Sequence, residues 1–334
     1  MNGDALPDLG FSLPDYGQGI SFSPLSGDLD AVDSADIFIS ASGGTELIAS
    51  AGDIDADGSG DLLVTYAGTG YEHCNYCASA SIARGPLVAG EYTTDDLDIQ
   101  LLDDVDYSGP GYFSVAPGDM DGDGVDDLVL GERGDYSESY QAIGAFFIPG
   151  PMTGDAYIRD VSMVLAGGVQ ATSSAGDQDG DGLTDLAFDV FSSDGGTVYI
   201  LSAPGADANI ADLAIATLTC SDSTHAVLDE AIDSAGDIDA DGHPDLVISG
   251  YDRHGNSSAD MGGAWIAYGP LIGAIDLSTA GTLLVGDYAG VQAGWSVAGA
   301  GDTNGDGFDD VLIGGRYDTS SGVGGRSWLV LGGI

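Results

Sequence analysis

Basic residues are almost missing from this sequence of 334 residues. It contains 55 acidic side chains, six arginines and no lysine, which gives a formal net charge of −49. Nucleic acid is therefore not expected as a partner, because proteins neutralise its phosphates with lysine and arginine. Binding to an anionic membrane surface is disfavoured for the same reason. Cations are the partners that this composition favours.

Long apolar runs are also missing, although apolar residues make up 43% of the chain and can form a folded core. No segment reaches the roughly 18 apolar residues of a membrane helix, so we expect no direct insertion into a membrane. The N-terminal residues lack the basic start and the apolar core of a signal peptide.

Cysteine is scarce as well. Three cysteines cannot all pair within one chain, which argues against a disulfide scaffold. Cys74 and Cys77 lie in the sequence HCNYC, which has no fourth zinc ligand nearby; a local disulfide and two thiols both remain open there. Cys220 ends an apolar run and is expected to be buried as a small apolar residue.

What the sequence does contain is an acidic loop that recurs along the chain. Its first complete copy, AGDIDADGSGDLLV, begins at Ala51, and four similar copies follow at intervals of 66, 58, 60 and 65 residues. A partial copy with Asn2, Asp4 and Asp8 opens the chain, and its first ligand would precede Met1. We therefore expect six repeats, in a chain that is cut from a longer protein. A period of about 60 residues suits a unit of four strands.

The segments between the acidic loops have the sequence pattern of short strands. Each repeat contains apolar runs rich in β-branched and aromatic residues, bounded by glycine, proline and aspartate, and none sustains a helical period. This pattern predicts an all-β fold, a β-propeller of four-stranded antiparallel blades. The coils of a β-solenoid are usually far shorter. We predict a single propeller domain over residues 1–334, with partial first and last blades and six or seven blades in total.

The acidic loop has the spacing D-x-[DN]-x-D-G-x-x-D, which brings oxygen atoms to one point. Positions 1, 3, 5 and 9 supply side-chain oxygens, position 7 supplies its backbone carbonyl, and glycine at position 6 permits a turn that a Cβ atom would obstruct. Hard oxygen ligands in a flexible loop favour calcium, so we predict five calcium sites and the partial sixth. The predicted ligands are Asp53, Asp55, Asp57, Ser59, Asp61; Asp119, Asp121, Asp123, Val125, Asp127; Asp177, Asp179, Asp181, Leu183, Asp185; Asp237, Asp239, Asp241, His243, Asp245; Asp302, Asn304, Asp306, Phe308 and Asp310.

Two other interpretations of the loop are weaker. An EF-hand needs an acidic residue at position 12 between two helices, and an apolar residue stands there in all five copies. These residues are Val64, Leu130, Phe188, Ile248 and Ile313. Solvated turns without an ion would leave carboxylates to repel one another, at about 4 kcal/mol for two charges 4 Å apart at an effective dielectric of about 20.

The sequences FSVAPGDMDGDGVDDLVLGE and GWSVAGAGDTNGDGFDDVLIGG resemble FG-GAP repeats, the units of the integrin α-subunit propeller. The resemblance covers nearly the whole chain, although the Phe-Gly pair appears only as variants such as Gly294-Trp295. It implies a propeller of about seven blades, with calcium loops on one face and ligand contacts on the other. A calcium loop in almost every blade is more similar to the bacterial extracellular members, which implies a secreted or cell-surface protein.

Two functions from different classes follow. The first is a non-catalytic adhesion or recognition module that binds an extracellular protein or glycan through its long, tyrosine-bearing loops. The alternative is an enzyme acting on extracellular polysaccharide, a lyase or hydrolase, or the accessory propeller of one. No Ser–His–Asp grouping is evident, and the missing lysine argues against an acidic sugar as substrate, so we predict no catalytic residue.

Overall fold

The computed structural model describes residues 9–13, 17–22, 35–40, 45–67, 78–102, 109–133, 144–190, 196–221, 228, 231–250, 261–287, 290–318 and 323–333. Its regular elements are almost all strands, which confirms the all-β prediction. Two compact units divide the chain, one formed by Met1–Ala166 with Gly205–Ala208 and the other by Gly167–Pro204 with Asn209–Ile334. None of the helices in these ranges is long and apolar enough to cross a membrane. A single domain over residues 1–334 stays a prediction.

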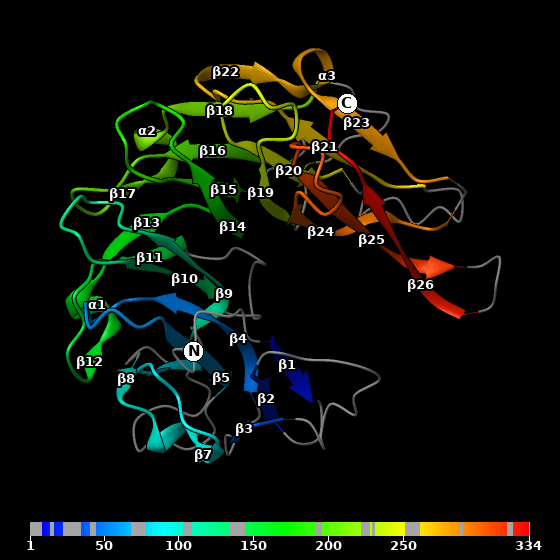
Figure 1. The fold of residues 1–334 in the computed structure, drawn as a ribbon. Helices are drawn as coiled ribbons and strands as arrows, with labels where there is room; N and C mark the ends of the chain where they lie inside the picture. The colour runs from blue at the N-terminus through cyan, green and yellow to red at the C-terminus, as the bar shows by residue number, and fades with distance from the viewer. Residues whose placement is uncertain are drawn as a thin grey trace, which may run out of the picture. The chain divides into compact units, whose positions relative to one another are not determined.

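The first unit holds three sheets, coloured blue to green in Figure 1. In spatial order they are β1 (Leu9–Leu13), β2 (Gly17–Ser21), β3 (Ile37–Ser40) and β7 (Gly90–Thr93); β4 (Thr45–Gly52), β5 (Asp61–Ala67), β6 (Ala78–Ala83), β8 (Ile99–Leu102) and β12 (Ala156–Tyr157); and β9 (Gly109–Gly118), β10 (Asp127–Arg133), β11 (Gly144–Ile148), β13 (Met163–Ala166) and β17 (Ala208–Asn209).

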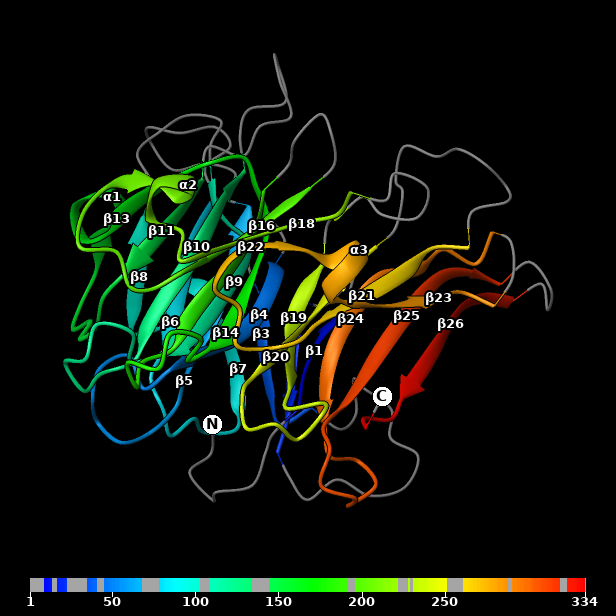
Figure 2. The ribbon, with the colours of Figure 1, turned by 90° about the horizontal axis from the view of Figure 1, so that it is seen from above.

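The second unit also holds three sheets, and its last three strands lie side by side in Figure 2. In spatial order the sheets are β14 (Val169–Gly176), β15 (Asp185–Val190), β16 (Thr197–Leu201), β18 (Ala216–Thr219) and β22 (Gly273–Asp276); β19 (Ile232–Gly236), β20 (Asp245–Ser249), β21 (Gly263–Ala267) and β23 (Thr282–Val285); and β24 (Ala293–Gly301), β25 (Asp310–Asp318) and β26 (Val323–Val330). The short helices are η1 (Thr94–Asp96), α1 (Ile158–Val161), α2 (Ile210–Leu213) and α3 (Leu277–Ala280).

Each sheet begins with three strands that are consecutive in sequence and antiparallel, as the repeat pattern predicts. Several sheets then gain a short outer strand from the next repeat, which runs parallel to its neighbour: β7 beside β3, β12 beside β8 and β22 beside β18. The prediction of four antiparallel strands missed this addition. Each added strand follows a turn with proline, such as Gly85-Pro86 before β7.

The central strands of the sheets are buried on both faces, which explains their unbroken apolar sequences. In the first unit, Leu63 of β5 packs in one cluster with Leu128 and Leu130 of the following sheet. In the second unit, Ala187 of β15 packs with Leu246 and Ile248 of β20. Face-to-face packing of successive sheets therefore forms the core within each unit, and it places every acidic loop at the end of a rigid hairpin.

Candidate metal sites

All five complete acidic loops occupy the same place in their sheets. In each, the first strand ends at the glycine just before position 1, and the second strand begins at the aspartate of position 9. The strand pairs are β4–β5, β9–β10, β14–β15, β19–β20 and β24–β25. This confirms a strand–loop–strand setting and excludes the two helices that an EF-hand requires.

The glycine at position 6 closes each loop onto the aspartate at position 1. Its backbone amide donates a hydrogen bond of 2.9 Å to that carboxylate in all five copies. Gly58, for example, has a φ of +90°, a conformation that L-residues with a side chain rarely adopt. A Cβ atom on Gly58 would nevertheless meet nothing within 4 Å. The predicted glycine is needed for its backbone conformation and not, as we expected, to avoid a clash.

The aspartate at position 9 is buried and is held by backbone amides from two directions. Asp127 is 0% exposed, and its carboxylate accepts hydrogen bonds from the amides of Met120 at 2.8 Å and Gly150 at 3.0 Å. Asp245 repeats this arrangement with Ile238 and Gly269, both at 2.8 Å. One carboxylate thus joins the start of the acidic loop to the turn that follows the third strand.

Four of the five loops gather carboxylates closely enough to hold a metal ion. In each cluster, one oxygen from each of three aspartates lies within 4.8 Å of the others. Three clusters use positions 1, 3 and 9, whereas the first loop uses positions 1, 3 and 5. The clusters are Asp53, Asp55, Asp57; Asp119, Asp121, Asp127; Asp177, Asp179, Asp185; and Asp237, Asp239, Asp245.

The remaining predicted ligands are placed differently. At position 5, Asp123, Asp181 and Asp241 lie outside the clusters, and each accepts a hydrogen bond from the amide of the residue at position 7. In the fifth loop, the Asn304 side-chain amide donates to Asp306 at 2.9 Å. The fifth site, and the carbonyl role of Ser59, Val125, Leu183, His243 and Phe308, stay predictions.

Burial disfavours the charge on the position 9 carboxylates. It raises the pKa of Asp61 and of Asp245 to about 6, against opposing hydrogen bonds from backbone amides. Burial likewise raises the pKa of Asp127 and Asp185 above the usual range. Asp310 differs, because a hydrogen bond from the Thr303 hydroxyl lowers its pKa. A bound cation would offset the cost of ionising the raised groups.

These pKa shifts predict opposite effects of pH on the cation-free and cation-loaded protein. Because the pKa of Asp245 is higher in the folded state than in the unfolded state, its contribution to stability is present below about pH 4 and is lost as the pH rises through about 6. We therefore expect the melting temperature in chelator to rise as the pH falls from 7 to 5.

With calcium, the protein should lose part of its ion-dependent stabilisation over the same range, since protons compete for the ligands. Thermal melts at pH 7, 6 and 5, with calcium and with chelator, measure both trends. Asp245→Asn, which cannot titrate, is the control and should reduce the dependence in chelator without abolishing it, because the pKa values of Asp61, Asp127 and Asp185 are also raised. The difference between the melting temperatures with calcium and with chelator should become smaller toward pH 5. A difference that stays constant would contradict competition between protons and calcium for these carboxylates.

A basic residue that the sequence pattern did not indicate lies beside the first loop. Arg84 follows β6, and its Nε atom lies 3.1 Å from Oδ2 of Asp55, a member of the first cluster. In the third complete repeat, Ser202 stands after the equivalent strand and its hydroxyl donates to Asp185 at 2.8 Å. The guanidinium therefore offsets part of the negative charge of the first cluster.

Several predicted features lie outside the described residues. They include the partial sixth loop with Asn2, Asp4 and Asp8, and the HCNYC sequence with Cys74 and Cys77. Most of the long, tyrosine-bearing loops lie outside as well. Cys220 is described, and it is half-buried against the apolar cluster of β15, β16 and β20, which agrees in part with its predicted burial.

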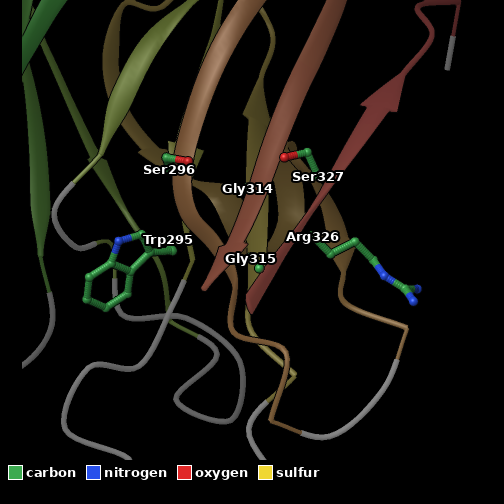
Figure 3. Close-up of a pocket in the computed structure, with 7 residues that line it drawn as sticks. Trp295, Ser296, Gly314, Gly315, Arg326 and Ser327 are labelled. Atoms are coloured by element: carbon green, nitrogen blue, oxygen red, sulfur yellow. The ribbon is translucent and has the colours of Figure 1, made fainter. Parts of the chain in front are cut away.

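A second feature is a hollow of about 460 Å³ on the sheet of β24, β25 and β26. Figure 3 shows the hydroxyls of Ser296 and Ser327 directed toward each other across Gly314, while Trp295 and Arg326 point away on opposite sides. Arg316 stacks over the Trp295 ring at 4.3 Å from its centroid. The hollow therefore combines hydroxyl groups with an exposed aromatic ring at its edge.

Comparisons with known proteins do not assign a family. A scan against models of protein families finds no match to this chain, and a search of curated proteins finds none either.

Proposed function

We propose that this chain is a calcium-binding, FG-GAP-type β-propeller that acts outside the cell as a non-catalytic adhesion or recognition module. The observation that carries the proposal is the set of four carboxylate clusters at one equivalent position in successive sheets. A single acidic turn occurs by chance on many surfaces, but four in the same register imply a shared ligand.

The ligand chemistry supports calcium over other metals. Every side chain in the four clusters is an aspartate, and hard oxygen donors suit calcium, magnesium and manganese. The loops are built from hydrogen-bonded turns with several glycines, and no cysteine or histidine side chain joins any cluster in the described ranges. Calcium accepts such variable geometry, whereas magnesium demands a near-ideal octahedron.

The packing of the sheets supports blades of a propeller. Within the first unit, the first strands of successive sheets lie next to one another, β4 beside β9 and β1 beside β4. Within the second unit, β19 contacts both β14 and β24. Radially repeated sheets of a propeller bring their inner strands together in this way.

An adhesion or recognition role follows from the scaffold and the composition. Metal-stiffened hairpins present loops on a rigid frame, and binding residues are concentrated on such loops. The hollow offers the hydroxyls of Ser296 and Ser327, and the Trp295 ring lies at its edge with Arg316 stacked over it; hydroxyls beside an aromatic ring suit a neutral glycan. A strongly anionic ligand is disfavoured by the net charge of −49.

Binding to arrays of glycans and matrix proteins tests this function. We expect retention of one ligand class in 1 mM calcium, a loss of at least tenfold in bound protein with chelator, and no release of product. The matched control is Trp295→Ala in calcium, which leaves all clusters intact and reports whether the hollow contributes to binding. Products released from a polysaccharide would instead support the alternative function, an enzyme. The absence of binding on every array would contradict an adhesion or recognition role.

A further inference from the structure

A carboxylate of one acidic loop reaches the loop of the preceding sheet. Oδ2 of Asp126 accepts a hydrogen bond of 2.7 Å from the backbone amide of Asp53, the residue at position 1 of the first loop. Gly52 makes room for this contact, because it has a φ of +71° and a Cβ there would lie 2.5 Å from the same oxygen. Neither Asp126 nor Gly52 is a predicted ligand, so metal binding by one loop alone does not account for the contact.

The same contact recurs in the second unit. Oδ2 of Asp309 accepts a hydrogen bond of 2.8 Å from the amide of Asp237, and the Asp309 amide donates to the Asp237 carbonyl at 3.1 Å. Gly236 again has a φ of +71°, and a Cβ at that residue would collide with the Asp309 carboxylate. Asp126 and Asp309 both occupy position 8 of their loops.

A third pair of loops, also within the second unit, lacks the carboxylate. Pro244 stands at position 8 of the fourth complete loop and packs on Gly176, just before the third loop. Here the link is neutral: the Gln178 side-chain amide donates to the Pro244 carbonyl at 2.8 Å, and its oxygen accepts from the Leu271 amide at 2.6 Å. Among these three pairs of loops, the charged link occurs in two, so it is not a requirement of the repeat.

We propose that Asp126 and Asp309 are positioning residues that couple neighbouring cation sites, so that calcium in one loop raises the calcium affinity of the loop before it. This inference rests on the calcium sites proposed above. Asp126 lies between Val125, a predicted carbonyl ligand, and Asp127, a member of the second cluster. An ion in the second loop fixes both neighbours and holds the Asp126 carboxylate against the Asp53 amide.

The hydrogen bond in turn orders the first residue of the preceding site. Asp53 is a member of the first cluster, and its main chain must adopt one conformation for its carboxylate to face the ion. A group that is ordered in advance binds more tightly, because less entropy is lost on binding. Hydrogen bonds to an ionised carboxylate are stronger than neutral ones, and allosteric couplings of about 5-fold or more are common.

Calcium titrations followed by NMR test the coupling at each site separately. The amide resonances of Gly58 and Gly124 report the first and second loops, because each amide donates to the position 1 aspartate of its own loop. In Asp126→Ala, we expect the calcium midpoint of Gly58 to rise about 5- to 10-fold; because coupling between two binding sites is reciprocal, the midpoint of Gly124 should rise as well, by the same factor or less. Asp126→Asn should restore part of the loss, since its amide oxygen still accepts the hydrogen bond.

Removal of the second site should have the same effect on the first. Asp121→Ala is expected to raise the Gly58 midpoint by a similar factor, and adding Asp126→Ala to it should produce no further change. The control is Asp95→Ala, which removes one exposed charge on η1. In the second unit, Asp309→Ala with Gly242 as the reporter repeats the test independently.

The outcomes separate the two proposals. If neither Gly58 nor Gly124 responds to calcium in the unmodified protein, the calcium sites themselves are wrong. If both respond, but the Gly58 midpoint stays within twofold of the unmodified value in Asp126→Ala and Asp121→Ala, the sites stand and the coupling is overturned.

Discussion

Removing calcium is expected to lower the melting temperature by about 10–20 °C. An ion that binds only the folded state at 100 times its Kd stabilises it by about 2.7 kcal/mol. Two clusters lie in each compact unit, so each unit gains about 5 kcal/mol, and each kcal/mol moves the midpoint by about 2–4 °C for domains of this size. Differential scanning calorimetry in 2 mM calcium and in excess chelator measures the difference.

Ionic screening has to be separated from site binding, because the chain carries a net charge of −49. The protein in excess chelator should therefore also be melted in sodium chloride, at matched and at higher ionic strength. We expect salt to recover only a minor part of the loss, and magnesium at 2 mM to recover less than calcium. Unchanged melting in excess chelator, or full recovery by sodium chloride, would rule out the sites.

Two substitutions in one loop should separate the structural role of a carboxylate from its role as a ligand. Asp127→Ala leaves the buried amides of Met120 and Gly150 without their acceptor and also removes a proposed calcium ligand. In calcium, we expect a loss of about 3–5 kcal/mol of unfolding free energy. In chelator, the loss should fall to about 1–2 kcal/mol, because the variant no longer buries an uncompensated charge.

The comparison variant is Asp121→Ala, which removes an exposed member of the same cluster. It should destabilise the protein in calcium but raise stability slightly in chelator, since one of three repelling charges is gone. Asp95→Ala, outside the loops, should change the free energy by less than about 0.5 kcal/mol in both conditions. Urea unfolding of the three variants gives the values. If calcium raised the unfolding free energy of Asp121→Ala as much as that of the unmodified protein, this result would contradict an ion shared by the three carboxylates.

The carboxylate clusters were predictable from local spacing. The acidic loops are hairpin connections whose ligands lie within nine residues of one another, and the glycine at position 6 and the apolar strand that follows are encoded in the same short segment. Alternating turn residues and β-branched runs likewise predicted the strands. These interactions form between residues that are close together in the sequence, so the sequence alone predicts them.

Contacts between sheets were not predictable in the same way. The hydrogen bond from the Asp53 amide joins residues 73 positions apart, and Arg84 meets Asp55 only because the third strand of the sheet ends beside the loop. The parallel strand that β12 adds to β8 depends on where the next repeat lies.

What the sequence determined by itself is therefore the repeat, its strands and the carboxylates that gather in four of its loops, all set by residues close together along the chain. Only the tertiary structure decided which carboxylates are buried, which loop is neutralised by an arginine and which loops touch. The physical reason is that burial and charge pairing depend on how whole sheets stack, and stacking brings together residues that no local spacing relates.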